Sequence, residues 1–373
     1  MRYPGVAIIV PCWNKAQTLE GTVRSLLAIE YPKDKLSIVI VDDGSTDDTL
    51  RAAMQFAQNP QVKVFHKENE GSKYGALNFG LAHSAGELVG CLDADSFVAP
   101  DALLEIVKQF EANPETMAVA PALKVNHPKK MLELMQSVEY TFGIFYKKMF
   151  DNLGAISVIP GPFSIYRREL FERVGPFRKA HHTEDMEMAF RMHSHGLTIT
   201  NAHTALVYTN VPSTVHALVR QRTRWSRGFL ENSRDYSYMY LNQKYGNFGM
   251  LILPFGLTAF AAGIYAGGYV LFHLLSWALG RALDLWITRI PPHVPSLWHV
   301  EWFYLNTSML TLLVVAVLGM TLTTIILGGK IAQTRLSFKS YFSYFALFGF
   351  VAPLWLVRAA WDTATSSERG WLT

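Results

Sequence analysis

The first hundred residues alternate between apolar runs of strand length and segments with helical spacing. The run "VAIIVPCWN" (6–14) predicts a buried strand that ends in a loop, and "AQTLEGTVRSLLAI" (16–29) predicts the helix that follows it. The same succession then repeats along the chain. The further predicted elements are an apolar strand over 36–41, a helix from about 49 to 58, a strand over 62–69, a helix over 71–84 and a strand over 86–97.

This alternation predicts an α/β domain with a mainly parallel sheet that is covered by helices on both faces. In such sheets, ligands bind at the edge where the parallel strands end. The segments Cys12–Asn14, Asp42–Asp43 and Asp93–Asp95 each come at the end of a predicted strand. We therefore expect the three polar segments to converge on one binding cleft.

The last third of the chain is mostly apolar and aromatic, over residues 248–361. Three stretches in it reach the length of about 20 residues that is needed to cross a bilayer. They are approximately 252–279, 303–328 and 341–361. The third stretch carries Pro353 and Arg358, which also fits a tilted or re-entrant segment.

The charges beside the apolar stretches predict an orientation in the membrane. The connection "GGKIAQTRLSFKS" carries Lys330, Arg335 and Lys339, so the positive-inside rule places it in the cytoplasm. With no signal peptide before the first strand, we expect the α/β domain to be cytoplasmic and the protein to lie in the plasma membrane. Three crossings would leave the tail, residues 362–373, outside, whereas a re-entrant third stretch would keep it inside.

The composition excludes two classes of function. The formal net charge of +4 is too small to indicate nucleic-acid binding, so we expect no nucleic-acid partner. The two cysteines, Cys12 and Cys91, cannot form a disulfide framework or a structural zinc site. We interpret both as reduced core residues.

The triplet "DAD" places Asp93 and Asp95 at the end of a predicted strand. Because side chains alternate along a strand, the two carboxylates are expected to point the same way. Paired carboxylate oxygens suit Mg²⁺ or Mn²⁺. A solvated turn is the alternative, since such triplets are common by chance.

Two further polar positions lie near this predicted edge. Capping of the next helix would explain one of Asp42 and Asp43 but not both. Lys73 begins another predicted helix, where a cation beside the helix N-terminus would suit a phosphate group. An ordinary surface lysine is the alternative for Lys73.

The segment "HHTEDMEMAFRMHSHG" predicts an amphipathic helix with Glu184 and Asp185 in its first turn. The helix dipole favours anions at this position, so the acids have a structural explanation. The functional alternative makes one of them a general base. Metal binding is a further, less favoured interpretation for the histidines of this segment, which are His181, His182, His193 and His195.

The segment "LVRQRTRWSRGFLEN" (218–232) precedes the first apolar stretch. Basic and aromatic residues often anchor a protein at the membrane interface. That interpretation is preferred for Arg220, Arg222 and Arg227. Gln221, Arg224 and Trp225 are three and four residues apart, so they share one face of a predicted helix.

Seven motifs occur in one order along the chain: "VPCWNK", "VDDGSTDDT", "GSKYGALNFGL", "DADS", "PGPFSIYRRELF", "HTEDMEMAFR" and "QRTRW". Together they resemble the processive branch of family 2 glycosyltransferases, which includes hyaluronan, chitin-oligosaccharide, poly-N-acetylglucosamine and cellulose synthases. The resemblance covers about residues 5–240. It implies a Rossmann-like GT-A domain over 1–212, an interfacial helix region over 213–247, a membrane region over 248–361 and a tail over 362–373.

The resemblance also implies a role for each matching residue. The residues expected to hold a UDP-sugar donor are Pro11, Trp13, Asn14, Asp43, Lys73, Asp93, Gln221 and Arg224. Asp95 would hold Mg²⁺ or Mn²⁺ on the diphosphate, and Asp185, next to Glu184, would be the catalytic base. The residues expected at the acceptor are Gly161, Pro162 and Trp225.

The implied reaction is a single displacement with inversion, because one base and no protein nucleophile are assigned. Its product would be a β-linked polysaccharide, and glycosylation of a membrane lipid is the alternative. A non-catalytic transporter or scaffold is a third reading, disfavoured because all four acids, Asp43, Asp93, Asp95 and Asp185, are intact. The lipid bilayer is an expected partner. Three membrane helices make a thin wall for a polymer channel, and three alternatives follow: a homo-oligomer, an accessory membrane protein, or no extrusion of a polymer.

Overall fold

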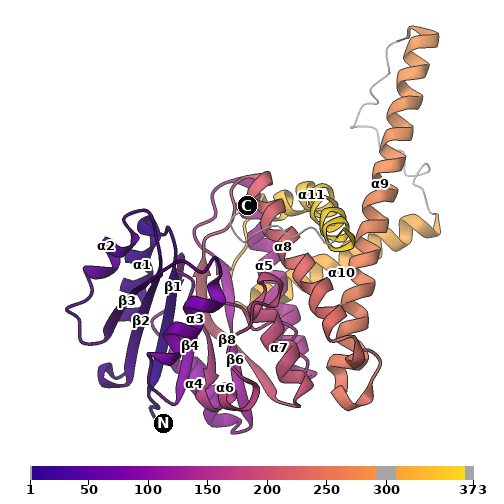
Figure 1. Ribbon diagram of the computed structural model, residues 1–373. Coiled ribbons are helices and arrows are strands. Elements are labelled where there is room, and N and C mark those ends of the chain that lie inside the picture. Colours follow the sequence, from indigo (N-terminus) through magenta and orange to yellow (C-terminus); the bar gives the residue numbers. More distant parts are fainter. Residues whose placement is uncertain (1, 291–307, 366–373) are drawn as a thin grey trace.

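A computed structural model describes residues 2–290 and 308–365 of the chain. Its centre is an eight-stranded mixed sheet with the strand order β3-β2-β1-β4-β7-β6-β8-β5 (Figure 1). The strands are β1 (Val6–Cys12), β2 (Leu36–Asp43), β3 (Val62–Lys67), β4 (Leu88–Cys91), β5 (Ser96–Val98), β6 (Thr116–Val125), β7 (Ser164–Arg167) and β8 (Thr198–Thr209).

The first half of the sheet has the predicted parallel arrangement. Strand β1 pairs in parallel with β2 and β4, and β2 pairs in parallel with β3. In the second half β7 runs antiparallel to both β4 and β6, and β5 runs antiparallel to β8. The α/β prediction is therefore confirmed, and the sheet as a whole is mixed.

The strand predicted over 86–97 is in fact two strands. Strand β4 ends at Cys91, and the chain turns before β5 begins at Ser96. The backbone N–H of Ser96 donates to the carbonyl of Asp93 across this turn, over 3.0 Å. An apolar run followed by acids does not reveal where a strand stops, so the pattern missed the break.

Helices cover both faces of the sheet. One core joins the sheet to α1 and α4, and the other joins it to α3, α6 and α7. Cys12 lies in the first core and Cys91 in the second, so both thiols are buried and free as predicted. The helices are α1 (Ala16–Leu27), α2 (Thr49–Met54), α3 (Lys73–Ala82), α4 (Ala102–Ala112), α5 (Met131–Asn152), α6 (Arg168–Val174) and α7 (Glu184–Ser194).

Helix α2 ends at Met54, earlier than the predicted end near residue 58. The backbone N–H groups of Phe56 and Ala57 donate to the carbonyls three residues before them, those of Ala53 and Met54. Such bonds tighten the last turn and end the α-helix.

Helix α8 (Val215–Asp235) lies directly against the start of α7. A Cβ on Gly228 would overlap the side chain of Thr183, so only glycine permits this approach. The amide of Asn232 donates to Oγ1 of Thr183 over 3.0 Å. These contacts hold α8 beside Thr183, and therefore beside Glu184, which follows it in the chain.

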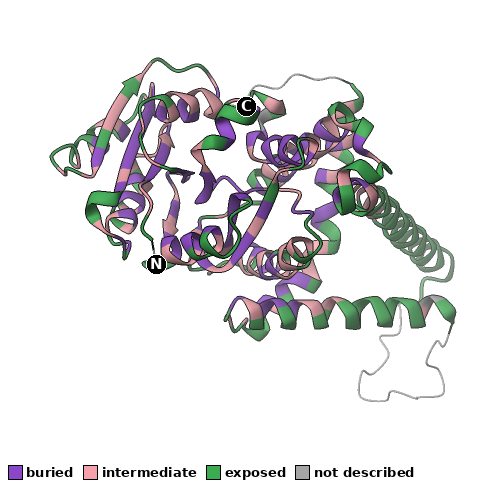
Figure 2. Ribbon diagram, turned by 90° about the horizontal axis from the view of Figure 1, so that it is seen from below, coloured by how far each residue is buried: buried purple, intermediate pink, exposed green. Residues whose placement is uncertain are grey.

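Among residues 2–290 and 308–365, three helices are long and apolar enough to cross a membrane. They are α9 (Leu253–Thr288), which continues a π-helical turn at Phe248–Ile252, α10 (Met309–Ile331) and α11 (Phe338–Ala364). Helix α9 projects away from the α/β domain (Figure 1), and α9 and α10 are exposed along most of their length (Figure 2). Residues 303–307, at the start of the predicted stretch over 303–328, lie outside the described residues. Residues 366–373 of the predicted tail also lie outside them.

Helix α5 connects the α/β domain to two of these apolar helices. One of its faces packs against α10 and α11 in a shared hydrophobic core. Leu132 and Met135 of α5 meet Ile325 of α10 and both Tyr344 and Trp355 of α11 in this core. Helix α11 therefore has a protein-facing side rather than an apolar surface all round.

Candidate active site

A cavity of about 610 Å³ opens at the edge where β1, β2 and β4 end, and its other walls come from β6, β8, α5, α7 and α8. It brings together thirteen of the fourteen residues named from the sequence. They are Pro11, Trp13, Asp43, Lys73, Asp93, Asp95, Gly161, Pro162, Glu184, Asp185, Gln221, Arg224 and Trp225. Asn14 is the exception: it lines an adjoining cavity, and its amide oxygen accepts from the backbone N–H of Thr46 over 2.9 Å.

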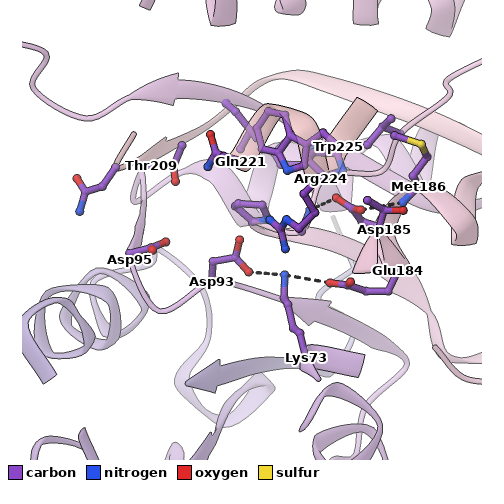
Figure 3. A pocket seen from close by; sticks show the side chains of 18 of the residues that line it. Lys73, Asp93, Asp95, Glu184, Asp185, Met186, Thr209, Gln221, Arg224 and Trp225 are labelled. Atoms are coloured by element: carbon purple, nitrogen blue, oxygen red, sulfur yellow. Dashed lines mark hydrogen bonds and ion pairs between the residues drawn. The ribbon is translucent and has the colours of Figure 1, made fainter. Parts of the chain in front are cut away.

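Lys73 lies between two carboxylates in this cavity (Figure 3). Its Nζ atom is 2.5 Å from Oδ1 of Asp93 and 3.3 Å from Oε1 of Glu184. Burial lowers the pKa of Lys73, but the two carboxylates outweigh burial and raise the pKa well above its ordinary value. A Cβ on Gly161 would lie 2.7 Å from this Nζ atom, so a larger residue there would displace the ammonium group. Lys73 is therefore a fixed cation.

Asp185 occupies the first turn of α7, as predicted. Its Oδ1 accepts from the backbone N–H of Met186 over 2.9 Å, and its Oδ2 accepts from that of Gly161 over 3.3 Å. Burial and the neighbouring Glu184 raise the pKa of Asp185 to about 6, against the opposing effect of Lys73. The group is thus a carboxylate at neutral pH that still takes up a proton readily, which are the properties of a general base.

Asp93 and Asp95 line the same cavity, as expected, but they have different ion-pair partners. Nζ of Lys15 is 2.7 Å from Oδ2 of Asp95, whereas Asp93 pairs with Lys73. Strand alternation is not the reason for their convergence, because the chain turns after β4 and neither residue lies in a strand.

The acids of the cavity fit a divalent cation only in part. Asp93 and Asp95 offer hard carboxylate oxygens, which Mg²⁺ and Mn²⁺ prefer. Within residues 2–290 and 308–365, no three His, Cys, Asp or Glu side chains converge as a metal site. A cation held at Asp95 would therefore take its other ligands from a substrate and from water, as diphosphate oxygens can provide.

The acids at the end of β2 have separate partners. Asp43 lines the cavity and its Oδ1 accepts from Nζ of Lys67 over 2.8 Å. Asp42 is fully buried and bonds to Nδ1 of His66 over 2.7 Å. Neither of the two acids caps α2, since Asp47 accepts from the first backbone N–H of that helix.

Helix α8 directs Gln221, Arg224 and Trp225 into the cavity, opposite Lys73 (Figure 3). The helical spacing predicted this shared face. The same helix corrects the interpretation of Arg222 as an interfacial anchor, because Arg222 is only 7% exposed and lines the cavity.

Arg222 is held by two partners. Its Nη2 atom is 3.0 Å from Oε2 of Glu139 on α5, and its guanidinium carbon lies 4.2 Å from the ring centroid of Trp225. A buried charge requires such a partner, and a planar guanidinium stacks well on an indole. Arg220, in contrast, is exposed and bonds to His216 over 2.9 Å.

Replacing Arg222 with lysine is expected to lower the free energy of unfolding by roughly 0.5–2 kcal/mol, which is the contribution of a cation–π contact. Lysine keeps the charge but loses the planar group on Trp225. The measurement is the thermal unfolding midpoint of the protein in detergent. Arg220→Lys is the control and should leave the midpoint unchanged, because Arg220 is exposed. Equal shifts for the two substitutions would show that the contact of Arg222 with Trp225 does not stabilise the protein.

Two of the histidines near α7, His181 and His193, have structural partners. His193 is buried, bonds to the carbonyl of Ile156 over 2.8 Å and stacks on Phe248. Burial lowers the pKa of His193 to about 4, so it is neutral. His181 pairs instead with Glu231 and Asp235 of α8.

Some cavity residues were not identified from the sequence. Helix α5 contributes Glu139, Tyr140 and Lys147, and β8 contributes Asn201. The only available signal was the spacing along α5, where cavity residues recur at one helical face. No motif marked that segment.

The α/β domain is similar to known glycosyltransferases. Residues 7–175 match the model of glycosyl transferase family 2. The poly-beta-1,6-N-acetyl-D-glucosamine synthase of Staphylococcus epidermidis is 32% identical over 225 residues, which are 60% of this chain and 54% of the relative. The synthase of Staphylococcus aureus (strain COL) is 31% identical over 226 residues, with the same coverage of 60% and 54%. The chain thus spans about half the length of the curated relatives it matches.

A solved structure supports the fold. The mannosyltransferase PcManGT from Pyrobaculum calidifontis, in complex with GDP-Man and Mn²⁺, matches with a TM-score of 0.61 and 19% identity. The match covers 99% of this chain and 89% of the mannosyltransferase. The GT-A fold predicted from the motifs is confirmed, with the similarity to glycosyl transferase family 2 over residues 7–175. Within residues 2–290 and 308–365, three helices apolar enough to span a membrane follow this region.

Proposed function

We propose that this protein is a membrane-bound inverting glycosyltransferase that extends a β-linked polysaccharide from a UDP-sugar. The observation that carries the proposal is the place of Asp185, whose carboxylate lies in the same cavity as Asp95 and Arg224. That cavity therefore has a base for the acceptor and groups that suit a diphosphate. The similarity to poly-beta-1,6-N-acetyl-D-glucosamine synthases favours UDP-N-acetylglucosamine as the donor.

Asp185 takes the proton from an acceptor hydroxyl while the hydroxyl oxygen attacks the anomeric carbon. The bond from that carbon to the diphosphate oxygen breaks, UDP leaves, and the configuration inverts. Arg224 stabilises the charge that develops on the diphosphate. Lys73 keeps Asp93 and Glu184 in place through its two ion pairs.

The donor side of the cavity is assigned to the remaining matched residues. Asp43 and the loop with Pro11, Trp13 and Asn14 hold the nucleoside, and Gln221 joins Arg224 at the diphosphate. Mg²⁺ or Mn²⁺ held by Asp95 would supply positive charge to the leaving diphosphate. Gly161, Pro162 and Trp225 border the acceptor, with the indole as a stacking surface for a sugar.

The three apolar helices indicate association with a membrane. We place the α/β domain in the cytoplasm for two reasons. The basic residues Lys330 and Arg335 lie at the C-terminal end of α10, and such residues favour the cytoplasmic side of a membrane. Helix α10 also packs against α5 of the α/β domain. A homo-oligomer or an accessory membrane protein would complete a channel for a polymer.

Purified protein in detergent is expected to release UDP from one of several UDP-sugars in the presence of a saccharide acceptor. The product should then be sized and its anomeric configuration determined by proton NMR. Long β-linked chains support the proposal, because they require repeated transfer with inversion. A single sugar on an extracted lipid would instead identify a lipid acceptor, and absence of UDP release with every donor would contradict a glycosyltransferase.

A further inference from the structure

The acid assigned to the nucleoside is held from outside the cavity by an ion pair at the edge of the sheet. Asp43 ends β2, and Lys67 ends β3, the neighbouring strand at that edge (Figure 1). The parallel register places the two residues opposite each other. Nζ of Lys67 is 2.8 Å from Oδ1 of Asp43. This ion pair has no role in the proposed transfer.

Lys67 is a fixed cation that does not itself line the cavity. Its Nζ atom also donates to the carbonyl of Glu68 over 2.8 Å and lies 3.1 Å from Oε1 of Glu70. Burial lowers the pKa of Lys67, but Asp43 and Glu70 outweigh burial and raise it. Lys67 lines neither the catalytic cavity nor the adjoining one, so it acts on a ligand of the catalytic cavity through Asp43.

The ion pair leaves Asp43 with one oxygen for a ligand. Asp43 lines the catalytic cavity, although it is only 5% exposed. Its Oδ1 is bonded to Lys67, which lies outside the cavity. Its Oδ2 makes no hydrogen bond within residues 2–290 and 308–365, and it is not one of the atoms there that are closed off from solvent. Oδ2 is therefore the acceptor that a ligand can reach.

A single acceptor favours one kind of nucleobase. An ionised carboxylate only accepts hydrogen bonds, and with both oxygens free it can accept two side by side. The pairing edge of guanine presents two adjacent N–H donors, which suit such a carboxylate. The corresponding edge of uracil has one N–H between two carbonyls, so a second free carboxylate oxygen would lie against a carbonyl. An oxygen that is bonded to a lysine removes both this repulsion and the second acceptor.

We propose that Lys67 is a positioning residue that makes Asp43 select uracil over guanine. Lys67 occupies Oδ1 of Asp43, and Oδ2 accepts from the N3–H of the base. The inference deepens the proposed function and rests on it, because Asp43 is assigned there to the nucleoside. The choice of nucleotide then depends on an ion pair outside the cavity.

The test measures the binding of UDP and GDP to the full-length protein in detergent by calorimetry, with Mg²⁺ and without acceptor. Wild type should bind UDP about tenfold more tightly than GDP, as expected from one hydrogen bond to a charged group. Lys67→Met should lower this ratio severalfold, because Oδ1 of Asp43 becomes a second acceptor. Lys67→Arg keeps the ion pair and should keep most of the preference. Inorganic pyrophosphate, which has no base, should bind wild type and Lys67→Met equally.

A double-mutant cycle separates positioning from a general structural effect. In an Asp43→Ala background, Lys67→Met should cause no further change of the ratio, since Lys67 acts through Asp43. Lys63→Met is the matched control, because Lys63 is an exposed lysine on the same strand that does not line the cavity. It should keep the wild-type ratio.

Equal binding of UDP and GDP by wild type, or a wild-type ratio in Lys67→Met, would overturn the inference. An equal loss of the ratio in the Asp43→Ala background would overturn it as well. If wild type releases UDP from a UDP-sugar while Lys67→Met keeps the wild-type ratio, the proposed function stands and only the inference fails. If wild type prefers UDP, loses this preference in Lys67→Met and transfers no sugar, the inference stands and the proposed function fails.

Discussion

Replacing Asp185 with asparagine is expected to lower kcat for sugar transfer by about 10²–10⁴-fold, the usual contribution of a general base. Asparagine has nearly the same shape but cannot take up the proton of the acceptor hydroxyl. Its one amide oxygen can still accept the shorter hydrogen bond, from the backbone N–H of Met186, and only the longer bond from Gly161 is lost, so the cavity should remain intact. The affinity for UDP should therefore change little, and both values can be measured on the same preparation.

The pH profile makes this prediction specific. The pKa of Asp185 is raised to about 6, and the base acts only when it is deprotonated. In wild type, kcat/KM should fall about tenfold for each pH unit below that pKa. Above that pKa, kcat/KM should not depend on pH. The residual activity of Asp185→Asn should lack this inflection, whereas Glu184→Gln should retain one. Transfer at a near wild-type rate by Asp185→Asn would show that another group is the base.

Removing the divalent cation, or its ligand Asp95, is expected to have the second largest effect. EDTA should abolish transfer, and added Mg²⁺ or Mn²⁺ should restore it. Asp95→Asn should lower kcat by about 10²–10³-fold, because a group that stabilises charge on the leaving diphosphate typically contributes that much. The rate should be measured over a range of metal concentrations, as a weakened site needs more metal.

Asp101→Asn is the control for this substitution. Asp101 is an exposed residue at the start of α4, makes no side-chain cap, and does not line the cavity. It should transfer sugar at the wild-type rate with the wild-type metal requirement. Full activity of the wild-type enzyme in excess EDTA would show that transfer needs no metal. Arg224 and Lys15 would then be the groups that stabilise the charge on the leaving diphosphate.

Local patterns predicted the parts of the site that depend on local geometry. The ends of parallel strands must meet at one edge of a sheet, so Trp13, Asp43 and Asp93 could be placed together from the sequence. Residues spaced by three and four must share a helical face, so Gln221 and Trp225 could be placed on one side of α8. Both statements follow from regular geometry and need no knowledge of distant contacts.

Distant contacts explain what was missed. Arg222 looked like a surface anchor because its partner, Glu139, lies 83 residues earlier on a helix that no motif marked. The reversed strand β7 was missed because side-chain alternation is the same in both directions of a strand. The break between β4 and β5 depends on the pairing of β5 with β8, more than one hundred residues away.

Helix α5 separates the cavity from the apolar helices α10 and α11. One face of this helix lines the cavity through Glu139, Tyr140 and Lys147, and another packs against α10 and α11. An α-helix with its side chains is about 10–12 Å across. In the proposed function, the acceptor hydroxyl would be separated from the apolar helices by roughly the thickness of one helix. A product extended at this site would then begin close to the helices that are apolar enough to enter the bilayer.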